Sequence, residues 1–176
     1  MGASEFDEAY EDDPAATPAE EQRLGEAILD ATVKDLDPAP AVSVPHTATV
    51  REAIRLMLDR DIGAVLVERD GRTVGIFTER DVLRRVAARD LDQSRPVADV
   101  MTPDPETLGP DDGIAFALNR MIVGGFRHVP IMGADGRAVA VISQREVVSY
   151  IVSVLPRRVL NLPPEPNLEA RSTDGG

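Results

Sequence analysis

Hydrophobic and polar positions follow the same pattern twice along this chain. In the first block, short apolar segments separated by polar residues predict strands, and apolar residues spaced three or four apart predict helices. The predicted elements are strands at 42–44, 64–67 and 73–77 and helices after Thr49 and over 79–89. Asp70-Gly71 lies between the last two strands and is typical of a hairpin turn. The first block therefore predicts the order β-α-β-β-α.

The second block repeats this order. It predicts strands near 106–108 and at 128–132 and 138–142, with helices over 112–122 and 144–154. Matched positions lie 64 residues apart before the hairpin turn, as in VKDL at 33–36 and VADV at 97–100. From the turn onward they lie 65 apart, as in Asp70 and Asp135. Such a repeat is one unit that cannot bury its own core, so the two copies should pack together.

The flanking segments differ from the repeats in composition. We expect a disordered acidic tail at 1–18, a short helix at 19–32, repeat one at 33–92, repeat two at 97–155 and a flexible, Pro-rich tail at 156–176. The predicted fold class is α+β, of the α/β-repeat type, with the two β-α-β-β-α copies packed by pseudo-twofold symmetry.

Composition and charge narrow the classes of function. The net charge is −12, which opposes binding to nucleic acid, and aromatic residues make up only 3% of the chain. The absence of cysteine excludes thiol nucleophiles and cysteine-ligated metals, and no spacing of residues predicts a catalytic or metal site. No apolar segment is long enough to span a membrane and no secretory signal is present, so we expect no membrane partner and a cytoplasmic protein.

The chemistry that stands out lies where a strand gives way to a helix in each repeat. Thr78 is placed to cap the helix and Asp81 to complete the capping box, and Ser143 and Glu146 repeat the arrangement. A second interpretation is that Thr78 and Asp81 bind the two hydroxyls of a ribose, which need a carboxylate at one fixed distance. Gly75 would leave room for close approach of a backbone or a ligand. The residues alone leave both interpretations open.

Three segments carry a resemblance to a known family. Residues 75–82 read GIFTERDV, residues 97–103 read VADVMTP and residues 127–131 read RHVPI. Together with the repeat, these resemble a free-standing pair of cystathionine-β-synthase (CBS) domains over about residues 33–155. The resemblance implies two clefts between the copies, an adenosine ligand such as AMP, ADP or ATP, and a homodimer.

The resemblance also implies roles for particular residues. Thr78 and Asp81 would bind ribose, with Ser143 as the matching residue of repeat two. Arg80, Arg127 and His128 are candidate phosphate contacts, and Ile62 and Ala64 are core positions that could also touch adenine. In repeat two, Ala140 and Glu146 replace the glycine and the aspartate, so we expect one intact site and one degraded site.

We therefore expect a non-catalytic sensor that requires no cofactor, binds an adenine nucleotide as a regulatory ligand and signals to an unknown protein partner. Three alternatives remain open. The pair could be an interaction module that dimerises without a nucleotide, it could bind another adenosyl ligand such as NAD or S-adenosylmethionine, or it could be an enzyme acting on nucleotides.

Overall fold

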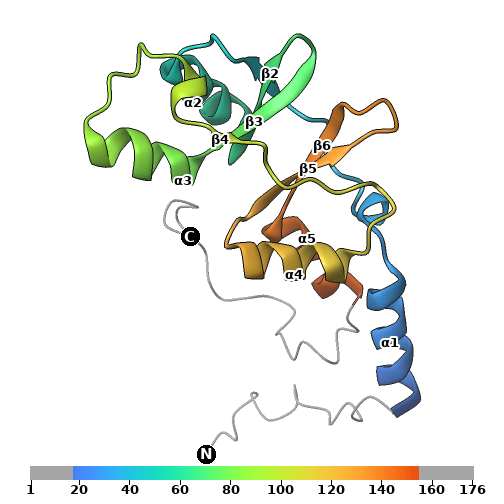
Figure 1. Cartoon of the computed structure of the whole chain (residues 1–176). Helices are drawn as coiled ribbons and strands as arrows, with labels where there is room; N and C mark the ends of the chain where they lie inside the picture. The colour runs from blue at the N-terminus through green and yellow to red at the C-terminus, as the bar shows by residue number, and fades with distance from the viewer. Residues whose placement is uncertain (1–17, 155–176) are drawn as a thin grey trace, which may run out of the picture.

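The computed structural model describes residues 18–154, so most of the expected acidic tail and all of the expected Pro-rich tail lie outside the described residues. Figure 1 shows two lobes whose strands lie side by side in the middle, with helices towards the outside. Helix α1 (Pro18–Asp30) packs against the two helices of the second lobe. It ends before the expected position 32, and a separate 3-10 turn, η1 (Val33–Leu36), follows it, begun by a capping box of Thr32 and Asp35.

The first lobe is built from repeat one. Its elements are β1 (Ser43–Pro45), α2 (Val50–Arg60), β2 (Ala64–Arg69), β3 (Arg72–Thr78) and α3 (Glu79–Asp81). Thr49 and Glu52 form the predicted capping box of α2, and Asp70 and Gly71 take the positive φ angles that their hairpin turn requires. Strand β2 runs parallel to β1 and antiparallel to β3.

The second lobe repeats this order with a sheet of only two strands. Its elements are α4 (Ile114–Gly124), β5 (His128–Met132), β6 (Ala138–Ser143) and α5 (Gln144–Val154). Repeat two also contributes β4 (Thr102–Pro103), which joins the four-stranded sheet of the first lobe. The predicted boundaries of β5 and α5 are confirmed. The strand predicted near 106–108 is wrong, because only Leu108 makes a bridge, to Ile131, and the rest of the segment is irregular.

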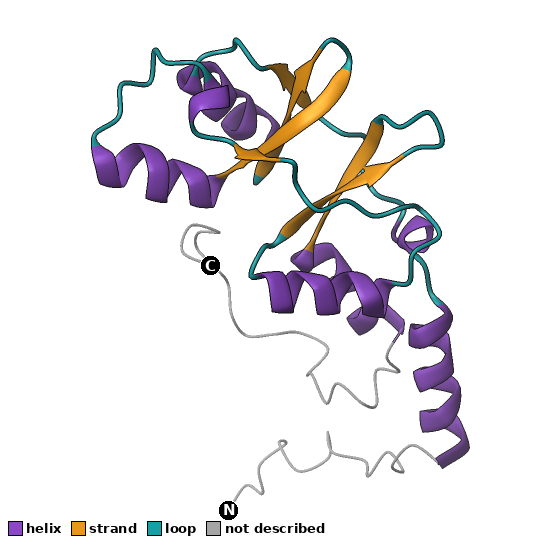
Figure 2. Ribbon diagram, viewed as in Figure 1, coloured by secondary structure: helices purple, strands orange, loops and turns teal. Residues whose placement is uncertain are grey.

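The helix predicted over 79–89 is confirmed in its bounds, but it is not a regular α-helix throughout. After α3 the chain forms a π-helical turn, η2 (Val82–Val86), and then a 3-10 turn, η3 (Ala87–Arg89). Figure 2 shows these turns following one another as a single helical rod. Turns of the π type are frequent at functional sites.

Each repeat lends a leading segment to the other repeat's hairpin. Strand β4, from the start of repeat two, pairs with β3, so that Gly75 faces Pro103 and Ile76 faces Thr102. At the corresponding place in repeat one, the segment before β1 contacts β6 of repeat two. Pro40 bridges to Ala140, and the Ala41 amide donates to the Val139 carbonyl oxygen at 2.9 Å. The two copies are therefore joined by exchanged segments, one of which is the strand β4, as well as by the loop between them.

Buried aliphatic residues form one core in each lobe and a small cluster between the lobes. The core of repeat one includes Val65 and Phe77, and that of repeat two includes Ile114 and Ile142. The third cluster contains Ala64, Leu66 and Ile76 of repeat one, with Ala138 and Val141 of repeat two packed against them. The predicted α+β fold of two repeats packed through their sheets is confirmed.

Candidate functional site

Two clefts lie where the repeats meet. The first cleft, of about 230 Å³, is lined by seven of the residues between 76 and 85 of repeat one, by Thr102, Pro105 and Glu106, and by residues 125–128 of repeat two. The second cleft, of about 1030 Å³, is lined by residues 141–153 of repeat two and by residues 61–64 and 36–42 of repeat one. Each cleft therefore combines the strand–helix junction of one repeat with the helix–strand turn of the other.

Asp81 lies at the base of the first cleft and is held by a capping box. Its Oδ2 accepts from the Thr78 amide at 3.0 Å and from the Thr78 hydroxyl at 2.8 Å, and the Thr78 hydroxyl accepts from the Asp81 amide at 3.3 Å. Asp81 is 8% exposed and is the one charged side chain that is buried within residues 18–154. The capping interpretation is therefore correct. The same hydrogen bonds also hold the Asp81 carboxylate in place where it faces the cleft.

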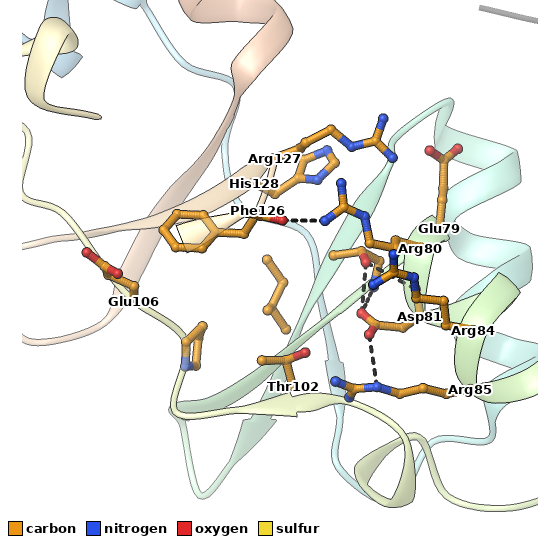
Figure 3. Close-up of a pocket in the computed structure, with 14 residues that line it drawn as sticks. Glu79, Arg80, Asp81, Arg84, Arg85, Thr102, Glu106, Phe126, Arg127 and His128 are labelled. Carbon is orange, nitrogen blue, oxygen red and sulfur yellow. Dashed lines mark hydrogen bonds and ion pairs between the residues drawn. The ribbon is translucent and has the colours of Figure 1, made fainter. Parts of the chain in front are cut away.

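The second oxygen of Asp81 is paired with an arginine from the π-helical turn. Arg85 Nε lies 3.2 Å from Asp81 Oδ1, and Arg85 Nη1 donates to the carbonyl oxygens of Val100 at 2.9 Å and Met101 at 2.5 Å. Arg85 therefore links the carboxylate to the segment that leads into β4. Figure 3 shows Arg85 beneath Asp81, beside Thr102 of β4.

Arg80 spans the first cleft from one repeat to the other. Its guanidinium donates to the carbonyl oxygen of Gly125, which is the left-handed residue that ends α4. The last carbonyls of a helix have no partner within the helix, so Arg80 satisfies one near this end. An arginine in this position can exchange a neutral carbonyl for an anion that enters the cleft.

Arg127 and His128 form the wall between the clefts, together with Glu79, because these three residues line both. The His128 ring lies against Gly63, where an added β-carbon would be 2.9 Å from Nε2. Burial holds the pKa of His128 below its usual value, and the nearby Glu79 carboxylate partly offsets this effect. The imidazole is therefore mainly neutral at pH 7.

Ser143 and Glu146 form the same capping box in the second cleft. Glu146 Oε2 accepts from the Ser143 amide and from the Ser143 hydroxyl, each at 2.6 Å. The position that matches Arg85 is Tyr150, and Glu146 has no cation at ion-pair distance among residues 18–154. The two clefts therefore share their backbone plan and differ in charge.

Comparison with known proteins identifies the repeat. A model described as "CBS domain" matches residues 33–88 and again 97–153, which together make up more than half of the chain. The chain belongs to the CBS domain family. It contains two tandem CBS domains, as the sequence motifs predicted.

Relatives and solved structures agree with this assignment. An uncharacterized 17.7 kDa protein from Acidianus ambivalens is 33% identical over 112 residues, which cover 63% of this chain and 67% of the relative. CBS domain-containing protein CBSCBSPB5 of Arabidopsis thaliana is 32% identical over 137 residues, 77% of this chain, and the match spans only a quarter of the Arabidopsis protein.

Among solved structures, the CBS-domain containing protein ATU1752 from Agrobacterium tumefaciens is 32% identical, with a TM-score of 0.63 over 68% of this chain and 98% of that chain. CBS domain protein PAE2072 from Pyrobaculum aerophilum, complexed with AMP, is 26% identical, with a TM-score of 0.62 over 70% and 99%.

The structure distributes the expected site residues between the two CBS clefts. Thr78, Arg80 and Asp81 meet in the first cleft, and Ile62, Ala64 and Ser143 line the second, while Arg127 and His128 line both. Gly75 lines neither. A β-carbon there would collide with Met101 and lie 3.0 Å from the Thr102 carbonyl oxygen, so the glycine allows β4 to approach β3.

The sequence did not predict several residues that line the first cleft. They are Arg84, Arg85, Thr102, Glu106 and Phe126. Arg85 carried a detectable signal, because comparing the repeats at the 65-residue offset sets it against Tyr150. Thr102 and Glu106 carried none, because they reach the cleft only through the exchanged strand β4 and the loop after it.

Proposed function

We propose that the first cleft binds an adenine nucleotide as a regulatory ligand. The observation that carries the proposal is the Asp81 carboxylate, held in place at the base of a cleft whose lining includes four arginines. A carboxylate can accept from two ribose hydroxyls, and arginines suit phosphate oxygens. The AMP complex of the related PAE2072 protein supports adenosine as the nucleoside.

Arg80 connects binding to a change in the protein. Its guanidinium donates to the Gly125 carbonyl oxygen of the other repeat. A phosphate in the cleft competes for that guanidinium, because a charged acceptor forms the stronger hydrogen bond. Occupancy then alters the contact between the repeats, which a partner protein could read, and no catalytic step is involved.

A homodimer is part of the same proposal. Leu58 in α2 and Ile122 in α4 occupy matched positions, 64 residues apart, and are 74% and 64% exposed. Leu83 and Val148, 65 residues apart, are likewise exposed. Large apolar side chains left in solvent at the same places in both repeats support one self-complementary surface for a second copy of the chain.

The direct test is a thermal shift and calorimetric titration with AMP, ADP, ATP, NAD and S-adenosylmethionine. A nucleotide that binds only the folded chain raises the melting temperature, and at one hundred times its Kd it adds about 2.7 kcal/mol of stability. Asp81→Ala should remove the response to AMP, ADP and ATP, and Glu146→Ala should retain it. If no adenine nucleotide stabilises the wild-type chain, the proposal is wrong.

The capping role of Asp81 needs its own control. Glu52→Ala removes the same kind of capping carboxylate from α2, outside both clefts. Both variants should be somewhat less stable than the wild type without ligand, because each loses the carboxylate of a capping box. Only Asp81→Ala should lose the response to nucleotide, which separates binding from helix capping.

A further inference from the structure

The second cleft repeats the backbone plan of the first with a different set of side chains. On the junction of repeat two, Ser149 and Tyr150 stand where repeat one has Arg84 and Arg85. In both cases an arginine of repeat one is replaced by an uncharged residue. On the opposite wall, the second cleft again has residues that are less basic than their counterparts in the first cleft. Asp61, Gly63 and Ala64 of repeat one stand where the first cleft has Gly125, Arg127 and His128.

These substitutions reverse the charge of the lining. The first cleft has four arginines against three carboxylates. The second has two arginines, Arg127 and Arg145, against the three carboxylates of Asp61, Glu79 and Glu146. A ligand is attracted to the cleft whose lining complements its own charge, so a phosphate is favoured in the first and opposed in the second.

The carboxylate of Glu146 is the main reason why the second cleft opposes the binding of a phosphate. Asp81 is neutralised by Arg85, but the phenol of Tyr150 brings no charge to Glu146. Glu146 Oε2 is held by Ser143, while Oε1 has no hydrogen-bond donor or ion pair among residues 18–154. A negatively charged oxygen in this state accepts from hydroxyls or cationic groups and repels anions.

We propose that the second cleft is a binding site for a nucleoside without phosphate, either uncharged or cationic. Glu146 and Ser143 would meet the ribose hydroxyls, and the aliphatic side chains of Ile62, Ala64 and Val141 would cover the base. The volume of about 1030 Å³ is at the upper end of the range for small-molecule sites. This inference rests on the proposed function only in its premise that the strand–helix junction recognises a ribose.

The test uses Asp81→Ala to silence the first cleft. Calorimetric titration of this variant with adenosine and with S-adenosylmethionine should show one site per chain, and AMP should bind at least about tenfold more weakly. Adding Tyr150→Arg places a cation at the position matching Arg85 and should raise the affinity for AMP by about tenfold. Tyr150→Phe is the matched control, since it changes the ring without adding charge, and should leave the preference unchanged.

The outcomes separate this inference from the proposed function. If the wild-type chain binds AMP and the Asp81→Ala chain binds neither adenosine nor S-adenosylmethionine, the proposed function stands and this inference fails. Equal affinity for AMP and adenosine in Asp81→Ala also overturns it. If the wild-type chain binds no adenine nucleotide while Asp81→Ala binds adenosine, the inference stands and the proposed function fails.

Discussion

Single residues decide how alike the two clefts are. Asp81 and Glu146 are both capping carboxylates, and each is held by the hydroxyl and amide of the preceding Thr or Ser. What separates them is the next turn of the chain, where Arg85 pairs with Asp81, whereas Tyr150 offers no cation to Glu146 and no other residue of 18–154 forms an ion pair with it. Two repeats with the same local geometry therefore present opposite electrostatic surfaces to a ligand.

His128 should make stability depend on pH in a narrow window. Its folded-state pKa is lowered chiefly by burial, and also by Arg127 and Arg80, while Glu79 and Glu146 oppose the shift. As pH falls below about 6.5, His128 becomes protonated in the unfolded chain while it stays neutral in the folded chain. The free energy of unfolding therefore declines. The decline ends once the pH is below the folded-state pKa.

The measurement compares the wild-type chain with His128→Gln by thermal melting from about pH 8 to about pH 5.5, a range that brackets the ordinary pKa of histidine. The melting temperature of the wild type should fall more steeply than that of the variant below about pH 6.5, and the two curves should run parallel above about pH 7.5. Asp35, Glu52 and Asp92 do not disturb this window, because hydrogen bonds lower their pKa values further below it. Parallel curves throughout would show that His128 takes up its proton normally in the folded chain.

Secondary-structure elements were predictable where the local pattern determines them. The α2 helix, the Asp70-Gly71 turn and the β5 strand follow from capping, turn chemistry and apolar periodicity. Strand β4 was not predictable, because its two residues become a strand only by pairing with β3 from the other repeat. The π-helical turn at 82–86 was missed for a related reason, since its apolar spacing also suits a regular helix.

The same limit applies to the site. Thr78 and Asp81 stand out because they are close in sequence, and the structure places them together. Arg127 and His128 reach the same cleft from a distant segment, and their shared position between the two clefts depends on how the repeats pack. Sequence can therefore indicate the strand–helix junction of such a site far better than the opposite wall.

The exposed faces of the helices carry a prediction about assembly. Ile122 in α4 is 64% exposed, and its repeat-one match Leu58 is 74% exposed. Ile122→Glu places a charge in the proposed contact between two chains and should shift the protein from dimer to monomer in sedimentation velocity. Arg60→Glu places the same carboxylate at the exposed end of α2, with a larger change in charge, and serves as a control that should leave assembly unchanged. A wild-type chain that sediments as a monomer at every concentration would contradict the proposed dimer.

At the scale of the whole molecule, the exchange of segments explains why the clefts sit between the repeats. Strand β4 closes the first cleft from below, and the segment at 39–42 borders the second. Neither cleft is complete within one repeat, since each needs the helix–strand turn of the other.

No helix within residues 18–154 is both long enough and apolar enough to cross a membrane.

Arg80 supplies the most direct test of coupling between the repeats. Replacing it with alanine removes the donor to Gly125, so amides at 125–128 should exchange hydrogen faster in the ligand-free variant than in the wild type. AMP should change the exchange of this segment in the wild type by drawing Arg80 away, and it should have much less effect in Arg80→Ala. Arg84→Ala is the matched control, because Arg84 lines the same cleft and makes no hydrogen bond to the described part of repeat two, residues 97–154. If AMP changes exchange at 125–128 equally in the wild type and in Arg80→Ala, the signal crosses between the repeats by a route other than this arginine.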